Sequence, residues 1–286
     1  YSWNRLAKFG IKLWPKFEKT IVKKLLLLAW PFGAALILSR LYGYADTVLL
    51  SLLAGDAAVG YYSVAYKVTF AWQFIASAFA ASLLPAFSSY FAGDKKWLPE
   101  TFTKSVHYLN IISFPLAAGF FVLAAPVIRF VYPQYEAAVV PLQILMFSLA
   151  FIFLTFPVGS LLSAGGRQKR YTLNLLITVI ISVSINFLLI PTYQAIGAAV
   201  GSLVSAAVYF VLGWVVVSQL IQVSYKQILF NAVRVAAAAL GMALLLTLLQ
   251  PYINLWLLII IGMVSYMILN LLLKSITIAE VKDFRR

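Results

Sequence analysis

Three ionisable residues lie inside apolar stretches of this sequence. Arg40 is near the middle of the first stretch, Asp46 follows six residues later, and Lys67 is inside the next stretch. An ionisable side chain at the centre of a membrane helix costs roughly 2.5–3.5 kcal/mol to insert, so each one requires a physical reason. A guanidinium without a counter-charge is explained when a polar cavity or an anionic ligand offers it a partner.

The spacing of these residues predicts one ion pair. Asp46 lies 8 residues before Ala54 and Lys67 lies 10 residues after Ala57, on either side of the connection AGDA. Antiparallel helices that rise about 1.5 Å per residue place the two at similar depths. We therefore predict an Asp46–Lys67 pair, with Arg40 left uncompensated beside Tyr44. The alternative is a purely stabilising triad of Arg40, Asp46 and Lys67. We favour a cation-lined cavity for an anionic substrate.

Two regular stripes follow further along the chain. Residues 168–190 contain polar side chains at a spacing of four, which places them on one helix face: Asn174, Thr178, Ser182 and Asn186. Gly197, Gly201 and Ser205 repeat the spacing in 196–221, the small-residue pattern that brings membrane helices close together. We favour the packing of a helix pair over the alternative, a polar track that faces a sugar.

The elements that must position these residues are membrane helices. The chain is 63% hydrophobic and 10% charged, with a mean hydropathy of +0.96. Roughly 20 apolar residues cross the hydrocarbon layer, and lipid forces the backbone to satisfy its own hydrogen bonds. We predict an all-α polytopic transmembrane helical bundle. Its eight predicted spans are 25–53, 57–91, 101–128, 137–163, 168–190, 196–221, 228–249 and 253–273.

The net charge of +14 is distributed as in a membrane protein and not as in a nucleic-acid-binding protein. Residues 1–24 interleave basic and aromatic side chains, which predicts an amphipathic helix on the cytoplasmic surface. Alternating the spans from a cytoplasmic N-terminus puts almost all loop cations inside and only Arg129 outside, so both termini are predicted to be cytoplasmic. Lys104, His107 and Arg234 are expected to extend to the headgroups. The alternative is a basic vestibule for an anionic headgroup.

Several chemistries lack their residues in this sequence. There is no cysteine and only one histidine, so neither thiol chemistry nor a histidine metal cluster is predicted. No nucleophile–base arrangement is visible, and the predicted external loops are short, so we predict no catalytic residues and no enzymatic activity. The chain begins at Tyr1 without an initiator Met, which we interpret as a cut through a longer polypeptide.

Four stretches together resemble a known family: VGYYSVAYKV (59–68), RFVYPQYEAAVVPLQIL (129–145), AGGRQKR (164–170) and LLIPTYQAIGAAVGSLVS (188–205). They resemble the C-terminal half of polysaccharide and O-antigen flippases, in the superfamily that includes MATE exporters and the lipid II flippase. Gln194 stands where that family usually has Gly, which should reshape the outer turn. The resemblance implies a cytoplasmic linker (1–24), a six-helix C-lobe (25–222), two additional helices (223–273) and a cytoplasmic tail (274–286).

The resemblance also implies a mechanism and a location. Two lobes would rock around a central cavity and carry a lipid-linked oligosaccharide across the cytoplasmic membrane of a prokaryote, so a missing N-terminal lobe or a partner chain is expected. Arg40 and Lys67 would bind the phosphate of the substrate, Asp46 would hold one of these cations in place, and Tyr44 completes the predicted substrate-binding set. No cofactor is implied, although Asp46 would suit proton or sodium coupling. The alternatives are a MATE-type exporter of cations and a membrane-embedded polysaccharide polymerase or ligase.

Overall fold

The computed structural model describes residues 18–275, and helices are the regular elements of this part of the chain. In chain order they are α2 (Lys19–Leu53), α3 (Asp56–Ala92), α4 (Trp97–Val131), the 3₁₀ turn η1 (Pro133–Ala138), α5 (Val139–Ala164), α6 (Gln168–Leu220), α7 (Tyr225–Leu249) and α8 (Leu255–Leu272). Among the described residues, seven helices are long and apolar enough to cross a membrane. The predicted all-α polytopic bundle is confirmed.

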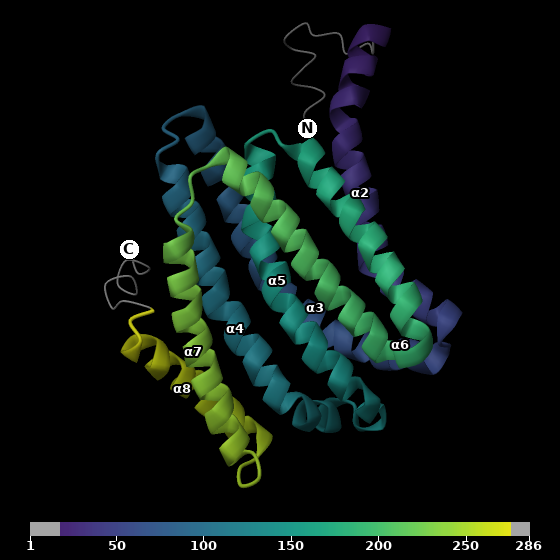
Figure 1. Ribbon diagram of the computed structural model, residues 1–286, viewed down its shortest axis with the longest axis vertical. Helices are drawn as coiled ribbons and strands as arrows, with labels where there is room; N and C mark the ends of the chain where they lie inside the picture. The colour runs from purple at the N-terminus through teal and green to yellow at the C-terminus, as the bar shows by residue number, and fades with distance from the viewer. Residues whose placement is uncertain (1–17, 276–286) are drawn as a thin grey trace, which may run out of the picture.

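The long helix α6 consists of two arms that fold back on each other (Figure 1). The reversal follows Pro191, at Gln194, where φ is 47° and ψ is −124°. Contacts across the arms are close: a β-carbon on Gly197 would lie 2.5 Å from the carbonyl oxygen of Leu189. The arms 168–193 and 195–220 therefore supply two crossings, and the bundle has the eight that the sequence predicts.

Helix α5 lies at the centre of the bundle. It packs against α3, α4 and α6 and buries Met146, Leu149 and Phe153. Helix α2 packs mainly on α6, α7 packs on α4, and α8 packs on α7. Figure 1 shows α7 and α8 beside α4, on the side of the bundle away from α2. The predicted division at residues 222 and 223 falls in the link between α6 and α7.

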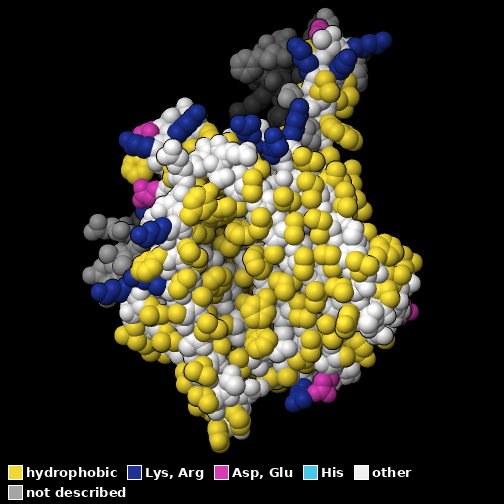
Figure 2. Space-filling model, in the orientation of Figure 1, with side chains coloured by type: hydrophobic (Ala, Val, Ile, Leu, Met, Phe, Trp, Pro, Cys, Tyr) yellow, Lys and Arg dark blue, Asp and Glu magenta, His cyan; other side chains and the backbone are white. Residues whose placement is uncertain are grey.

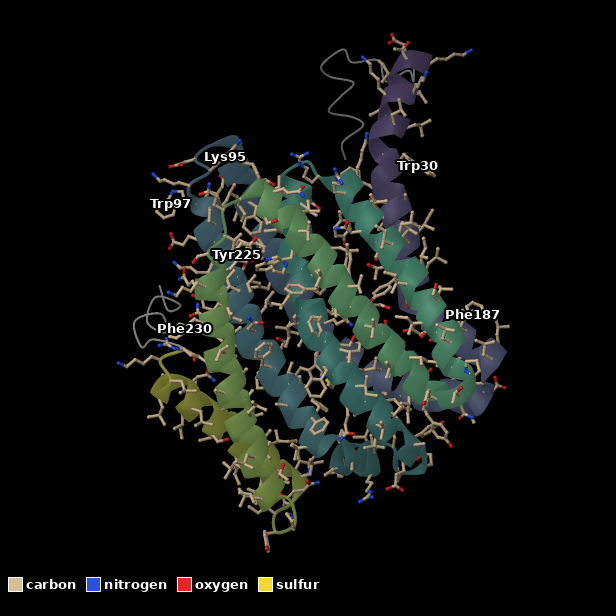
Figure 3. The ribbon with its side chains drawn as sticks, viewed as in Figure 1. Trp30, Lys95, Trp97, Phe187, Tyr225 and Phe230 are labelled. Carbon is tan, nitrogen blue, oxygen red and sulfur yellow. The ribbon has the colours of Figure 1, made fainter. Side chains whose placement is uncertain are left out.

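The outer surface of the bundle is apolar, as a lipid environment requires. Hydrophobic side chains cover most of the face shown in Figure 2. Trp30 and Phe187 are 71% and 53% exposed and lie at the outer edge of the bundle in Figure 3. An exposed apolar surface of this extent would associate in water, so contact with lipid or with another protein surface explains it.

Basic residues gather at one end of the bundle (Figure 2). Lys95 and Lys96 lie in the link before α4, Arg167 lies before α6, and Lys226 is in the first turn of α7. At the opposite end, Arg129 forms an ion pair with Glu136 at 2.5 Å. The loop cations that the sequence predicts on one side of the membrane therefore lie at one end of the bundle, and Arg129 lies at the other end.

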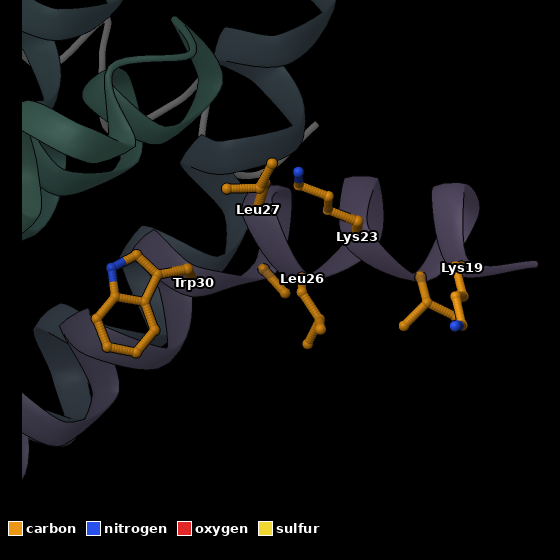
Figure 4. Close-up of a pocket in the computed structure, with 7 residues that line it drawn as sticks. Lys19, Lys23, Leu26, Leu27 and Trp30 are labelled. Carbon is orange, nitrogen blue, oxygen red and sulfur yellow. The ribbon is translucent and has the colours of Figure 1, made fainter.

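The first helix begins earlier than the first predicted span. Residues 1–17 of the predicted amphipathic segment lie outside the described residues, whereas Lys19 already begins α2 and the helix continues without a break into the apolar run. Figure 4 shows Lys19 and Lys23 on the same helix as Leu26 and Trp30. Cations followed by an interfacial Trp are typical of a helix that enters the membrane from a charged surface.

Candidate functional site

A buried carboxylate lies where α2, α3 and both arms of α6 meet. Asp46 of α2 is 7% exposed and accepts hydrogen bonds on both of its oxygens. The Tyr62 hydroxyl donates to Oδ2 at 2.6 Å, and the Asn186 amide donates to Oδ1 at 2.6 Å. The hydroxyl of Ser202 also donates to Oδ2, and that of Ser182 to Oδ1 at 3.4 Å. We call these five side chains the Asp46 cluster.

The local structure of each helix explains how this cluster forms. Ser182 and Asn186 are four residues apart on the first arm of α6, so both face α2. The turn at Gln194 brings the second arm back, with Gly201 against the Asn186 side chain and Ser202 beside Asp46. Ser148 of α5 donates to the carbonyl oxygen of Ser202 at 3.2 Å, which ties this arm to the central helix.

The cluster supplies dipoles instead of a counter-charge to the carboxylate. Hydroxyl and amide donors stabilise an ionised carboxylate through charge-assisted hydrogen bonds. The ion pairs among the described residues are Lys96–Asp94, Lys104–Glu100 and Arg129–Glu136, and none includes Asp46. A carboxylate with four donors and no cationic side chain can take up a proton or a small cation when its donors rotate.

The predicted Asp46–Lys67 ion pair is wrong. Asp46 contacts Tyr62, and a β-carbon on Gly43 would lie 3.9 Å from the Tyr66 hydroxyl, so these contacts fix the register of α2 and α3. In this register, the positions of Lys67 and Arg40 along the bundle axis differ by no more than about one helical turn, because each residue of a helix adds only about 1.5 Å. Counting residues from the connection predicted the depth of Lys67 to within a few residues. It did not predict which face of α3 carries Lys67, and this side chain is exposed.

Arg40 is also exposed, and Tyr44 lies on the same face of α2. Together with Leu41 and Val48 they line an open apolar groove along this helix. Arg40 lies 13 residues from the end of α2 at Leu53, or about 20 Å along the helix axis. The two cations are therefore at similar depth along the membrane-spanning helices, on the surface of the described bundle.

The four residues of the predicted polar track face the interior. Thr178, Ser182 and Asn186 are at most 1% exposed, and Asn174 is 7% exposed. Ser182 and Asn186 belong to the Asp46 cluster, while the Thr178 hydroxyl donates to the Asn174 carbonyl oxygen at 2.8 Å. In this structure the stripe holds α2 and the arms of α6 together, as the packing interpretation expects.

The fold matches known transporters. The structure of the lipid II flippase MurJ in an inward closed conformation superposes with a TM-score of 0.73 and 18% identity, over 93% of this chain and 57% of that chain. A multidrug resistance MATE transporter of the MOP superfamily, in an outward-facing conformation, gives a TM-score of 0.60 at 18% identity, over 78% of this chain and 53% of that one.

The sequence comparisons point to proteins of polysaccharide biosynthesis and to flippases. Residues 6–141 match the family model described as polysaccharide biosynthesis protein. Over 223 residues the chain is 25% identical to the lipid II flippase MurJ of Bacillus subtilis, which covers 71% of this chain and 40% of that protein. Among the proteins that the chain resembles are a membrane protein of the cps region of Klebsiella pneumoniae, at 26% identity, and a probable flippase of Haloferax volcanii, at 22% identity. The chain spans between 35% and 43% of the length of the curated relatives it matches.

The flippase signature around residue 194 now has a physical explanation. The family usually has Gly where this chain has Gln194, and the backbone there has a positive φ. Only Gly adopts this conformation without a steric penalty. The sequence departs from the family at this position, but the backbone keeps the turn that a Gly would favour.

Of the three residues expected to extend to the headgroups, His107 is arranged differently from our expectation. His107 is 9% exposed instead of reaching toward the headgroups, and its Nε2 lies 2.8 Å from the Ser275 carbonyl oxygen. Lys104 pairs with Glu100 at 2.7 Å on an exposed surface, and Arg234 stacks on Phe230 at 4.0 Å. His107 therefore fixes the end of α8 to α4.

Two members of the Asp46 cluster were missed at the sequence level. Tyr62 is a hydroxyl-bearing residue 7 positions after Gly55, and Asp46 is 9 positions before it, so depth matching could have found their contact. Ser202 follows Gly201 in the small-residue stripe. Its contact with Asp46 depends on the sharp reversal of α6, which spacing alone does not specify.

Proposed function

We propose that this chain is the C-terminal lobe, with two added helices, of a flippase that moves a lipid-linked oligosaccharide across the cytoplasmic membrane by alternating access. The observation that carries the proposal is that two cations, Arg40 on α2 and Lys67 on α3, lie at similar depth and are both exposed on the bundle. No ion pair among the described residues neutralises either of them. A phosphate or pyrophosphate group on the substrate would neutralise them.

The lipid part of such a substrate also finds a suitable surface. A cavity of about 540 Å³ lies between α4, α7 and α8, and its lining is almost entirely apolar. Leu123, Met242 and Leu258 contribute to its apolar lining. A hydrocarbon tail gains about 0.8 kcal/mol for each CH₂ group that it removes from water, so a cavity of this kind would hold part of a polyprenyl chain.

The Asp46 cluster would couple transport to an ion. A carboxylate surrounded by the hydroxyls of Tyr62 and Ser202 offers oxygen ligands to a sodium ion, and the same carboxylate can accept a proton. The two alternatives differ in their dependence on the medium. Transport that requires sodium at constant pH supports the ion, and transport that follows a proton gradient without sodium supports the proton.

A MATE-type exporter of cations is the second candidate, because the fold is shared. A cationic cargo would require carboxylates on the cavity face. In residues 18–275, Asp46 is the carboxylate deepest within the spans, and it is enclosed by donors, whereas Arg40 and Lys67 are exposed. The geometry favours an anionic cargo. A polymerase or ligase is the third candidate, and the relatives with an assigned function are flippases or transporters.

We also propose that the basic end of the bundle is cytoplasmic and that both termini lie there, in the inner membrane of a prokaryote. The loop cations at that end, with Arg129 paired at the other, support this orientation under the positive-inside rule.

Substitution of Arg40 tests the proposed function. Arg40→Ala should abolish export of the polysaccharide while the protein still inserts in the membrane at normal levels. The matched control is Arg129→Ala, which removes an exposed arginine at the end of the bundle and should leave export unchanged. Normal surface polysaccharide in the Arg40→Ala strain would contradict the phosphate-binding role.

A further inference from the structure

Another cavity lies between α2, α3, α5 and α6, and it differs in chemistry from the apolar cavity and groove described above. Its volume is about 470 Å³, within the range of about 300–1,000 Å³ that small-molecule sites occupy. Three tyrosines, five Ser or Thr hydroxyls and no charged side chain line it. We call it the tyrosine cavity, after Tyr42, Tyr171 and Tyr209.

The three tyrosines form one wall of aromatic rings. The ring centroids of Tyr171 and Tyr209 are 6.0 Å apart with an interplanar angle of 64°, and those of Tyr42 and Tyr209 are 6.5 Å apart at 47°. Gly159 of α5 permits this arrangement, because a β-carbon there would lie 3.1 Å from the Tyr171 ring. The rings are tilted against one another, so the wall presents both ring faces and ring edges to the cavity.

The hydroxyls around this wall are arranged for a ligand with its own hydroxyls. Thr155 and Ser160 donate to the carbonyl oxygens of Ile152 and Ala80, which leaves the lone pairs on their own oxygens free to accept. The buried Tyr209 hydroxyl lies beside that of Tyr171, so at most one of the two hydroxyl protons is used between them and the other is left to donate. A buried donor without an acceptor is costly and indicates a missing partner.

We propose that the tyrosine cavity binds an uncharged sugar ring of the oligosaccharide cargo. A pyranose has C–H faces that pack on aromatic rings and rim hydroxyls that both donate and accept. A charged group would be desolvated there without a counter-charge, which the cavity lacks. This inference rests on the proposed function, and it assigns the sugar and the phosphate to different places.

The position of the cavity relative to the cations supports this division. Ser39 lines the tyrosine cavity and is directly followed by Arg40 on α2. Ser39, Ser77 and Ala81 are exposed, so the cavity opens between α2 and α3. A ring that entered through this opening would keep its phosphate near the level of Arg40.

Binding measurements on the full-length protein in detergent test this assignment. The probes are a panel of uncharged di- and trisaccharides and, separately, inorganic pyrophosphate, each measured by titration calorimetry. Tyr209→Phe removes one hydroxyl and should weaken binding of the sugar that the protein selects about fivefold, as expected for one hydrogen bond. Ala81→Trp should close the opening and abolish sugar binding. The matched control, Tyr252→Phe, alters a tyrosine that is 85% exposed and should change neither.

The outcomes separate the sugar site from the phosphate site. We expect pyrophosphate binding to persist in Tyr209→Phe and Ala81→Trp and to fall in Arg40→Ala. Sugar affinity that is unchanged by Ala81→Trp, or pyrophosphate binding with no sugar bound from the panel, would overturn the sugar site and leave the cavity to water. If the protein binds a sugar but Arg40→Ala leaves the affinity for pyrophosphate unchanged, the result would instead contradict the proposed function.

Discussion

At the residue scale, the Asp46 cluster shows how a carboxylate is accommodated within a membrane bundle. The Asp46 carboxylate of α2 accepts from donors on α3 and on both arms of α6, so one side chain holds these three helices together. Each donor to a charged acceptor contributes more than an ordinary hydrogen bond, because the interaction replaces strong hydration of the ion. The same bonds that stabilise the bundle therefore hold the Asp46 carboxylate in place.

Loss of one donor should be measurable as a loss of stability. Ser202→Ala removes a hydroxyl from the Asp46 carboxylate and should lower the free energy of unfolding by about 1.5–3 kcal/mol, the range for hydrogen bonds to charged groups. Ser218→Ala is the control on the same arm of α6, because that exposed hydroxyl donates only to the Val215 carbonyl oxygen. Thermal unfolding in detergent compares the two. If the two variants were equally stable, the Ser202 hydroxyl would not stabilise the bundle through the Asp46 carboxylate.

The sequence identified Asp46, Arg40 and Lys67 correctly as unusual residues but did not predict their partners. Hydropathy gives the depth of a residue in the membrane, whereas a contact requires the rotation of each helix about its axis. That rotation is fixed by packing, as the Asp46–Tyr62 bond and the approach of Gly43 to Tyr66 show. His107 illustrates the same limit, since its depth predicted a surface position and the end of α8 covers it.

At the element scale, the two arms of α6 depend on small residues. Gly197 faces the backbone of the first arm, where the Leu189 carbonyl oxygen would lie 2.5 Å from an added β-carbon. Backbone atoms cannot rotate away as a flexible side chain can. The small-residue stripe that the sequence displays is therefore a close contact between the arms, and it determines how deeply Ser202 approaches Asp46.

Gly197→Ala should accordingly separate the arms. We expect the free energy of unfolding to fall by about 1–3 kcal/mol, as for overpacked interiors. Gly33→Ala is the matched control, because a β-carbon at Gly33 meets no atom within 4 Å. Unfolding curves of the two variants measure the difference. A Gly197→Ala protein as stable as the control would mean that the arms are further apart than in this structure.

At the turn between these arms, we expect a substitution to increase the stability of the protein. Gln194 has a φ of 47°, a region that costs a residue with a β-carbon about 1–3 kcal/mol. Gln194→Gly should therefore raise the melting temperature. Gln227→Gly provides the control, because Gln227 lies in the helix α7 and is exposed, where Gly costs up to about 1 kcal/mol. If both variants were destabilised equally, the turn would not be strained.

Most of the element pattern follows from the sequence, because apolar run length and turn residues define membrane helices strongly. The predicted connections at 54–57 and 191–195 both coincide with reversals of the chain. Helix ends are less well specified: α2 starts at Lys19, six residues before the predicted span, because lysines at a membrane surface continue a helix as readily as they end it.

At the scale of the whole molecule, the bundle has two kinds of exposed apolar surface. One is purely apolar, as at Phe187 and Leu188 on α6. The other, along α2, places Arg40 and Tyr44 among apolar residues. A cation at this depth is poorly tolerated against lipid, so the α2 face requires either water or a second protein surface. We infer that it lines the transport cavity in the assembled flippase.

Cysteine accessibility distinguishes these two surfaces, and the chain has no native cysteine to interfere. Single cysteines at Tyr44 and Val48 should react with a water-soluble maleimide in membranes that contain the full-length protein, because a hydrated cavity admits the reagent. Cysteines at Phe187 and Leu188 are the matched controls: they are exposed to a similar extent, but they should stay unlabelled within lipid. An excess of soluble lipid-free pyrophosphate should slow the labelling at Tyr44, one turn from Arg40, more than at Val48, two turns away. Labelling of α2 no faster than labelling of α6 would mean that Arg40 faces lipid, and the anionic-substrate cavity would have to be abandoned.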